Sequence, residues 1–179
     1  FQFGNGPAWD SVLIELPYQL YRFYGKDEII KENAEAIEKY FGYIKTRLNA
    51  DGLIEIGLGD WCQTYTSAEG DYETPVEITD SLTIIDMVEK TAEMFGVIGK
   101  NAEDIKQFGN YLKNSFRQKY IKNGQLTVKT QTALSMCLQL NIFNAEEVQT
   151  AYETLLSEIK KQNDHFRVGV IGYKYLFDV

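Results

Sequence analysis

The residues with the clearest chemical potential lie in a polar connection, residues 49–75, between two helical segments. A connection longer than about 12–15 residues in a compact domain is usually functional or disordered. Its centre, Gly57–Cys62, reads Gly-Leu-Gly-Asp-Trp-Cys, so an indole directly follows a carboxylate. Trp61 could stack on the apolar face of a sugar or another polar ligand, while Asp60 accepts hydrogen bonds from its hydroxyl groups. The structural alternative is that Trp61 closes the end of the core and Asp60 caps a turn.

The composition narrows the possible chemistry. The chain has 179 residues, which suggests one domain, and its net charge of −8 argues against nucleic acid as a partner. No apolar run approaches the roughly 20 residues that cross a bilayer. Cys62, Cys137 and a single histidine give neither a disulfide framework nor a metal site, and no phosphate-binding glycine loop occurs, so we expect no metal and no cofactor. We interpret the acidic cluster Glu69, Asp71 and Glu73 as a solvated loop face.

The elements that must position this loop are helices of two kinds. Four segments are apolar on most sides, and the three between them carry one apolar stripe opposite a charged face. The only possible strand is Leu53–Ile56. The seven expected helices cover residues 9–24, 27–48, 75–95, 102–121, 129–142, 145–162 and the segment from Val168.

This alternation predicts an all-α fold, part of an (α/α)6 toroid in which buried inner helices alternate with outer ones. The connections from an outer helix to the next inner one are mostly the longer ones, and in a toroid they all lie at one end. We therefore expect Trp9, Asp60, Trp61, Gln131 and His165 to approach one rim. Concave sites with aromatic walls and a few polar groups are typical ligand sites.

Four groups of residues carry a resemblance to a known family. In chain order they are Pro7-Ala8-Trp9 with Leu16-Pro17-Tyr18-Gln19-Leu20-Tyr21 and Tyr24-Gly25; Gly59-Asp60-Trp61 with Thr74-Pro75; Gln131-Thr132-Ala133; and His165 with Gly169 and Gly172. Together they resemble the central part of the catalytic (α/α)6 domain of bacterial α-L-rhamnosidases of glycoside hydrolase family 78. The chain departs from the family pattern after Trp9, where Asp10 is displaced by one position, and no role is carried over to it.

The resemblance implies removal of terminal α-L-rhamnose by inverting hydrolysis, with two carboxyl groups about 6.5–9.5 Å apart. It implies that Trp9, Asp60, Trp61 and His165 bind the sugar, whereas Gln131 fits better as a helix-start residue bonded to backbone. The family's general acid belongs to a motif upstream of Trp9 and its general base to a motif downstream of the last residue. Neither motif is in this sequence, so we expect no catalytic residue here.

Several expectations accompany this interpretation. Residues 1–179 would be a fragment of one catalytic domain, truncated at both ends, and its partner would be a rhamnose-containing glycoside or oligosaccharide in the bacterial cytoplasm or periplasm. Two alternatives stay open: another α/α-toroid carbohydrate enzyme, such as a glucuronyl hydrolase, and a non-catalytic helical interaction scaffold. Truncation would also expose apolar helix faces through which the fragment could self-associate. These faces carry Val12, Leu16 and Leu20 at one end and Val170, Tyr173 and Phe177 at the other.

Overall fold

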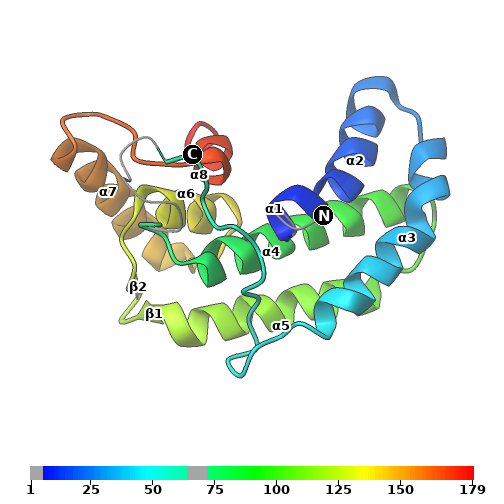
Figure 1. Cartoon of the computed structure of the whole chain (residues 1–179), viewed down its shortest axis with the longest axis horizontal. Coiled ribbons are helices and arrows are strands. Elements are labelled where there is room, and N and C mark those ends of the chain that lie inside the picture. The colour runs from blue at the N-terminus through cyan, green and yellow to red at the C-terminus, as the bar shows by residue number, and fades with distance from the viewer. Residues whose placement is uncertain (1–5, 64–71) are drawn as a thin grey trace.

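The structure, a computed structural model, describes residues 6–63 and 72–179 and is built mainly of helices (Figure 1). The helices are α1 Pro7–Asp10, α2 Val12–Tyr24, α3 Glu28–Lys45, α4 Val76–Val97, α5 Glu103–Tyr120, α6 Gln131–Gln139, α7 Ala145–Lys161 and α8 Val170–Leu176. A small antiparallel hairpin, β1 Ile121–Lys122 and β2 Gln125–Leu126, connects α5 to α6. No helix in the described ranges has the length and apolar character needed to cross a membrane.

Six of the seven expected helices are observed as single elements, and the first is divided. Ser11 separates α1 from α2, and its hydroxyl donates to the carbonyl of Ala8 at 2.8 Å. Pro17 lies inside α2 and is buried. Gly25 ends α2 in the left-handed conformation, with φ of 66°, so the helix stops at residue 24, where the expected range 9–24 also ends.

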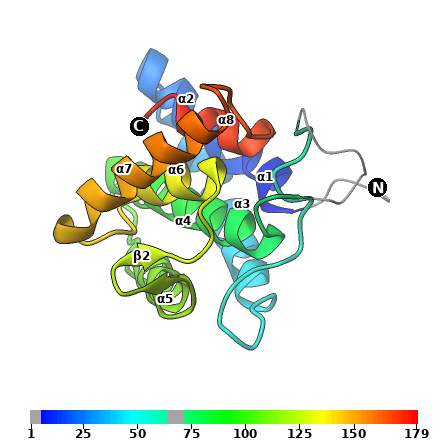
Figure 2. The ribbon, with the colours of Figure 1, turned by 90° about the vertical axis from the view of Figure 1, so that its left-hand side faces the viewer.

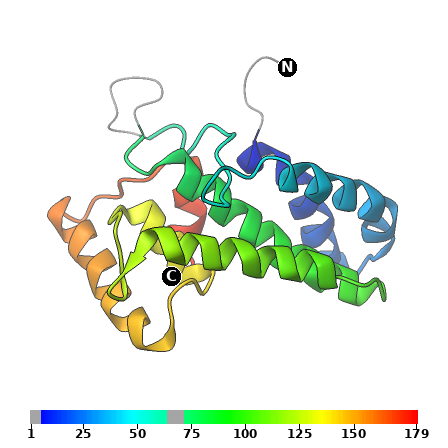
Figure 3. The same ribbon diagram turned by 90° about the horizontal axis from the view of Figure 1, so that it is seen from below.

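The predicted alternation of inner and outer helices is confirmed. α3, α5 and α7 bury one stripe each, whereas most residues of α4 and α6 are buried. The inner helices pack in the order α2, α4, α6, α8, and each of the first three also contacts the outer helix that follows it. α5 runs along α4 in Figure 3, and α7 lies beside α6 in Figure 2.

The two outermost inner helices are only partly covered. α4 and α6 each pack closely against an inner helix on both sides. Among the described elements, α2 packs closely against α4 and α8 against α6, and α2 and α8 meet through the ion pair of Glu15 and Lys174. Val12 and Leu16 on α2 are exposed, as are Val170 and Tyr173 on α8 and Phe177 at its end. α2 and α8 therefore carry more apolar side chains than they bury against the described elements.

The sequence predicted a possible strand at the wrong position. Leu53–Ile56 forms no strand, only an isolated bridge between Leu48 and Ile54. The hairpin was missed because two-residue strands are too short to show alternation; its turn is formed by Asn123 and Gly124. Both turn residues have positive φ, 51° and 75°, as a tight hairpin of this kind requires.

Candidate functional site

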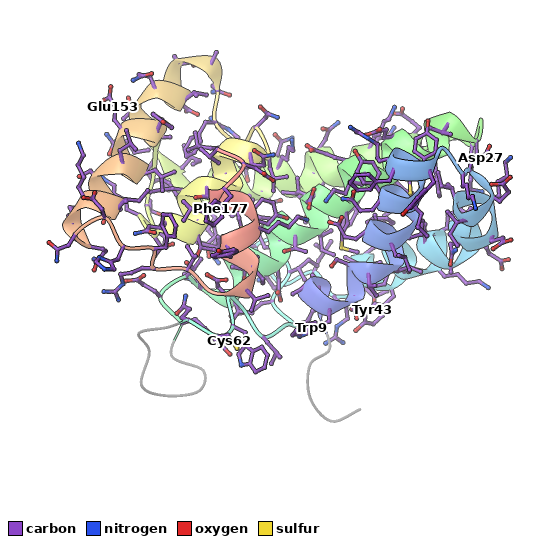
Figure 4. All side chains as sticks on the ribbon, turned by 90° about the horizontal axis from the view of Figure 1, so that it is seen from above. Trp9, Asp27, Tyr43, Cys62, Glu153 and Phe177 are labelled. Carbon is purple, nitrogen blue, oxygen red and sulfur yellow. The ribbon has the colours of Figure 1, made fainter. Side chains whose placement is uncertain are left out.

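Two tryptophans from distant parts of the sequence meet at one edge of the molecule. The rings of Trp9 on α1 and Trp61 on the connecting loop lie edge to face, with centroids 6.1 Å apart and planes at 71°. Figure 4 shows Trp9 beside Cys62, the neighbour of Trp61, at this edge. Trp9 is 45% exposed and Trp61 39% exposed. Neither therefore closes the core, and both present apolar ring surface to solvent.

The loop that carries Trp61 is held against α8 by two sets of hydrogen bonds, one to the backbone of Trp61 and one to the side chain of Asp60. Val170 N–H donates to the carbonyl of Trp61 at 2.8 Å. The carboxylate of Asp60 accepts backbone N–H bonds from Gly169 at 2.7 Å and Gly172 at 2.8 Å, and a bond from the Thr132 hydroxyl on α6. These bonds fix the position of Trp61 relative to two inner helices.

Asp60 therefore corrects one expectation. It was predicted to contact the sugar, but it is fully buried. Its two oxygens are occupied by the N-terminal turn of α8 and by Thr132. A buried carboxylate is stable only when it is hydrogen-bonded in this way. Its role is closer to the structural alternative, because it holds the loop.

A second buried carboxylate holds the start of the same loop. Asp80 on α4 accepts the backbone N–H groups of Ile56 at 2.8 Å and Gly57 at 2.6 Å through Oδ2. Burial raises the pKa of Asp80 to about 6, although these two N–H bonds oppose the rise. The loop thus reaches Trp61 between two carboxylate anchors, one on α4 and one facing α6 and α8.

A cavity of about 170 Å³ lies beneath the two tryptophans. Drug-sized ligands occupy pockets of about 300–1,000 Å³, so this one suits a smaller molecule such as a single sugar ring. Apolar side chains make up much of its lining, and three charged side chains, Glu15, Asp86 and Lys174, form the part that we call the floor. The lining residues are Ala8, Trp9, Ser11, Glu15, Leu58, Gly59, Trp61, Thr83, Asp86, Val170, Ile171, Lys174 and Tyr175.

The floor is a cluster of opposite charges that joins three inner helices. Lys174 Nζ on α8 lies 2.6 Å from Glu15 Oε1 on α2 and 3.1 Å from Asp86 Oδ2 on α4. Lys90 contacts the same two carboxylates, and the Tyr175 hydroxyl donates to Asp86 at 2.7 Å. Burial raises the pKa of Asp86, but the charges of Lys174 and Lys90 outweigh it and hold the pKa below its usual value.

Sequence reasoning missed this cluster. Glu15, Asp86 and Lys174 are all more than 70 residues apart in the sequence: Lys174 is 88 residues from Asp86 and 159 from Glu15. One signal was available: Asp86 interrupts an otherwise apolar stretch of α4, between Ile85 and Met87. A charge on an inner helix needs a partner or a function.

His165 lies at the same end but not in the cavity. Its loop is attached to the start of α6, because Gln131 Nε2 donates to the His165 carbonyl at 3.1 Å and Gln131 Oε1 accepts from Arg167 N–H at 3.0 Å. This confirms the assignment of Gln131 to a helix start with backbone partners. The His165 ring is exposed, and its Nδ1 lies 2.8 Å from the Asn163 carbonyl. The structure therefore brings Trp9 and Trp61 together and leaves His165 out of their pocket.

The remaining reactive groups are scattered. Within the described ranges, no group of three His, Cys, Asp or Glu side chains is placed to hold a metal ion. Cys62 is exposed and Cys137 is buried, and both are free thiols. Of the acidic loop cluster, Glu69 and Asp71 lie outside the described residues, and Glu73 pairs with Arg167 at 3.1 Å.

The comparisons with known proteins agree on one family. The profile of the bacterial α-L-rhamnosidase six-hairpin glycosidase domain matches residues 2–179. An α-L-rhamnosidase of Streptomyces avermitilis is 23% identical over 180 residues, which cover 98% of this chain and 17% of that protein. The chain thus spans about a sixth of the length of this relative.

Two solved structures share the fold. The structure of an α-L-rhamnosidase from Dictyoglumus thermophilum superposes with a TM-score of 0.87 at 27% identity, covering 97% of this chain and 20% of that one. That of the Streptomyces avermitilis α-L-rhamnosidase complexed with L-rhamnose gives a TM-score of 0.83 at 20% identity, covering 94% of this chain and 16% of that one. The expected six-hairpin toroid architecture is confirmed.

Proposed function

The chain belongs to the bacterial α-L-rhamnosidase six-hairpin glycosidase domain family, and from this we propose that it supplies one wall of a rhamnose-binding pocket in a glycosidase that removes terminal α-L-rhamnose. The observation that carries the proposal is the edge-to-face pair of Trp9 and Trp61 above a cavity with a charged floor. Apolar ring faces over polar groups suit a sugar, which has an apolar face and hydroxyl edges. The relative complexed with L-rhamnose supports the choice of sugar.

The carboxyl groups of this pocket do not fit the proton-transfer roles of the reaction. An inverting glycosidase needs a general acid whose pKa is raised and a base that activates water on the opposite face. The pKa of Asp86 is instead lowered, and Glu15 is bound by two lysines. We therefore propose that both proton-transfer groups lie outside these 179 residues. Residues 1–179 would then form the central part of one (α/α)6 domain.

The test compares the natural protein, at its full encoded length, with two variants. Trp61→Ala removes a pocket wall, and Tyr152→Ala removes an exposed aromatic ring of α7 far from the cavity. We expect the natural protein to hydrolyse an aryl α-L-rhamnoside. The Trp61→Ala variant should lower kcat/KM by about tenfold, because stacking and burial of one ring contribute on the order of 1–2 kcal/mol. Tyr152→Ala should leave it unchanged.

Two results would contradict the proposal. One is a full-length protein that releases nothing from the rhamnoside but acts on another sugar. The other is hydrolysis by residues 1–179 alone that Glu15→Gln or Asp60→Asn abolishes, because an acid of this chain would then take part in proton transfer.

We also propose that residues 1–179, when produced alone, associate with a second copy through the exposed flanks of α2 and α8. Val12 and Leu16 lie on one flank and Tyr173 and Phe177 on the other, all of them exposed, whereas the exposed Val170 lines the cavity. Contiguous apolar patches of more than a few hundred Å² are rare on monomers. At about 25 cal/mol per Å², covering such a patch favours association by several kcal/mol before the entropic costs.

A further inference from the structure

We propose that Glu15, Asp86 and Lys174 bind two neighbouring hydroxyl groups of the sugar ring and thereby determine which sugar the pocket accepts. This inference rests on the proposed function, because it concerns the floor of the same pocket. The three residues come from α2, α4 and α8, and all three line the cavity beneath Trp9 and Trp61.

Each of the three side chains keeps unused hydrogen-bonding capacity. Glu15 accepts both of its lysine bonds through Oε1, and Asp86 accepts all three of its bonds through Oδ2. Within the described part of the chain, Glu15 Oε2 and Asp86 Oδ1 have no hydrogen-bond partner. They are also absent from the set of fully buried atoms that lack one. Little of either side chain is exposed, 21% for Glu15 and 11% for Asp86, but both residues line the cavity, so each oxygen can accept a bond from a molecule bound there.

Lys174 can also donate to a ligand. An ammonium group has three N–H donors, and Lys174 uses two of them, on Glu15 and Asp86. Its side chain is 46% exposed, whereas that of Lys90 in the same cluster is 14% exposed. One accessible donor beside two accessible acceptors matches a pair of hydroxyl groups, since each hydroxyl both donates and accepts.

Helix packing alone does not require such a cluster. Buried charge pairs are often no more stabilising than well-packed apolar residues of similar size. Glu15 of α2 bonds Lys90 of α4, and Lys174 of α8 bonds Asp86 of α4. Apolar side chains at these positions would hold the helices together as well. Charged residues at these positions instead give the cavity hydrogen-bonding atoms for a ligand, which apolar residues would not provide.

The experiment measures whether the cluster senses individual hydroxyl groups. Binding of L-rhamnose and of its 2-, 3- and 4-deoxy forms is measured by titration calorimetry on the natural protein at its full encoded length. A site that hydrogen-bonds a hydroxyl through charged groups discriminates strongly against the analogue that lacks it. We expect two deoxy sugars with adjacent positions to bind about tenfold more weakly than rhamnose, and the third to bind within about twofold.

Two variants separate hydroxyl binding from a structural role. Lys174→Met removes the accessible donor. Lys90→Met removes a lysine bonded to the same two carboxylates but absent from the cavity lining. The deoxy penalty is the loss of affinity of a deoxy sugar relative to L-rhamnose in the same protein. For at least one deoxy sugar, we expect this penalty to shrink to within about twofold in Lys174→Met and to persist in Lys90→Met. If Lys174→Met does not fold, as judged by circular dichroism, Glu15→Gln takes its place and should reduce the same penalty.

The outcomes distinguish the two proposals. A natural protein that binds no L-rhamnose contradicts the proposed function. Rhamnose binding with the same deoxy penalties in natural protein, Lys174→Met and Glu15→Gln overturns only the inference about the floor. Loss of the penalties to an equal extent in Lys90→Met and Lys174→Met also overturns it, because the cluster would then act only by holding the helices.

Discussion

Asp60 determines where Trp61 lies without reaching the cavity itself. The carboxylate is fully buried, and its three strongest bonds come from Gly169, Gly172 and Thr132. All three partners are donors, so the site requires a group that only accepts. A carboxylate meets this requirement, and a carboxamide does not.

Asp60→Asn is therefore expected to destabilise the protein by about 1–3 kcal/mol, because its amide NH₂ would face a donor and leave it unsatisfied. Urea unfolding measures this change. The control is Asp51→Asn, which removes an exposed ion pair with Lys119 and should change stability by less than about 1 kcal/mol. Equal losses of unfolding free energy in the two variants would show that the buried hydrogen bonds of Asp60 stabilise the protein no more than the exposed ion pair of Asp51.

Asp80 gives a prediction for the pH dependence of stability. Burial raises its pKa from 3.8 to about 6. Between these values the native carboxyl binds a proton that the unfolded chain has released, so this group lowers stability as the pH rises through that window. Asp80→Asn does not titrate. The unfolding free energy of the natural chain minus that of Asp80→Asn should therefore fall by on the order of 2–3 kcal/mol from about pH 4 to pH 7.

Chemical denaturation of both proteins at several pH values provides the measurement. The contributions of the other titrating groups are common to both proteins and cancel in the difference. A difference that stays flat across this range, or rises with pH, would contradict the assignment of a raised pKa to Asp80.

At the scale of elements, α8 depends on its contact with the tryptophan loop. A Cβ atom at Gly169 would lie 2.3 Å from the carbonyl oxygen of Asp60 and 2.4 Å from that of Trp61. Both obstacles are backbone atoms, so no side-chain rotation relieves the clash. The glycine lets the loop approach closely enough for the Val170 N–H bond to Trp61.

Gly169→Ala should therefore move the loop away from α8 and destabilise the protein by more than about 2 kcal/mol. It should also increase quenching of tryptophan fluorescence by acrylamide, because Trp61 loses its attachment. The matched control is Gly42→Ala in α3, where a Cβ meets nothing within 4 Å; it should be neutral or stabilising by about 0.5–1 kcal/mol. A Gly169→Ala protein as stable as Gly42→Ala would contradict this account of the contact.

At the scale of the whole molecule, the helix order places apolar surface on two flanks. α4 and α6 are enclosed between inner neighbours, while the free sides of α2 and α8 expose Leu16 and Tyr173 among others. The two flanks belong to opposite ends of the row of inner helices. A second copy could therefore cover one or both of them.

Residues 1–179 produced alone should sediment as dimers or larger species at micromolar concentration. Replacing Leu16 and Tyr173 by lysine should shift the protein toward the monomer, because charges oppose burial of both flanks. Tyr152→Lys, on the exposed face of α7, should leave the association unchanged. A monomer that binds no apolar dye before any substitution would contradict the proposal of self-association.

The sequence by itself predicted most of the helical framework. The stripes of α3, α5 and α7 and the broad apolar character of α4 and α6 follow from the spacing of neighbouring residues, because a helix repeats every 3.6 residues. Order and connection lengths then placed Trp9 and Trp61 at one rim. The division at Ser11 and the short hairpin were not predictable from periodicity, because both are shorter than the window that reveals it.

Only the tertiary structure decided what each polar residue does. Asp60 and Trp61 are adjacent in sequence, yet one is buried and the other faces the cavity. The bonds that separate their roles come from residues more than 70 positions away. The charged floor likewise exists only where α2, α4 and α8 meet. Local spacing determines which residues share a helix face, but packing between distant helices determines which charges find partners and which remain open to a ligand.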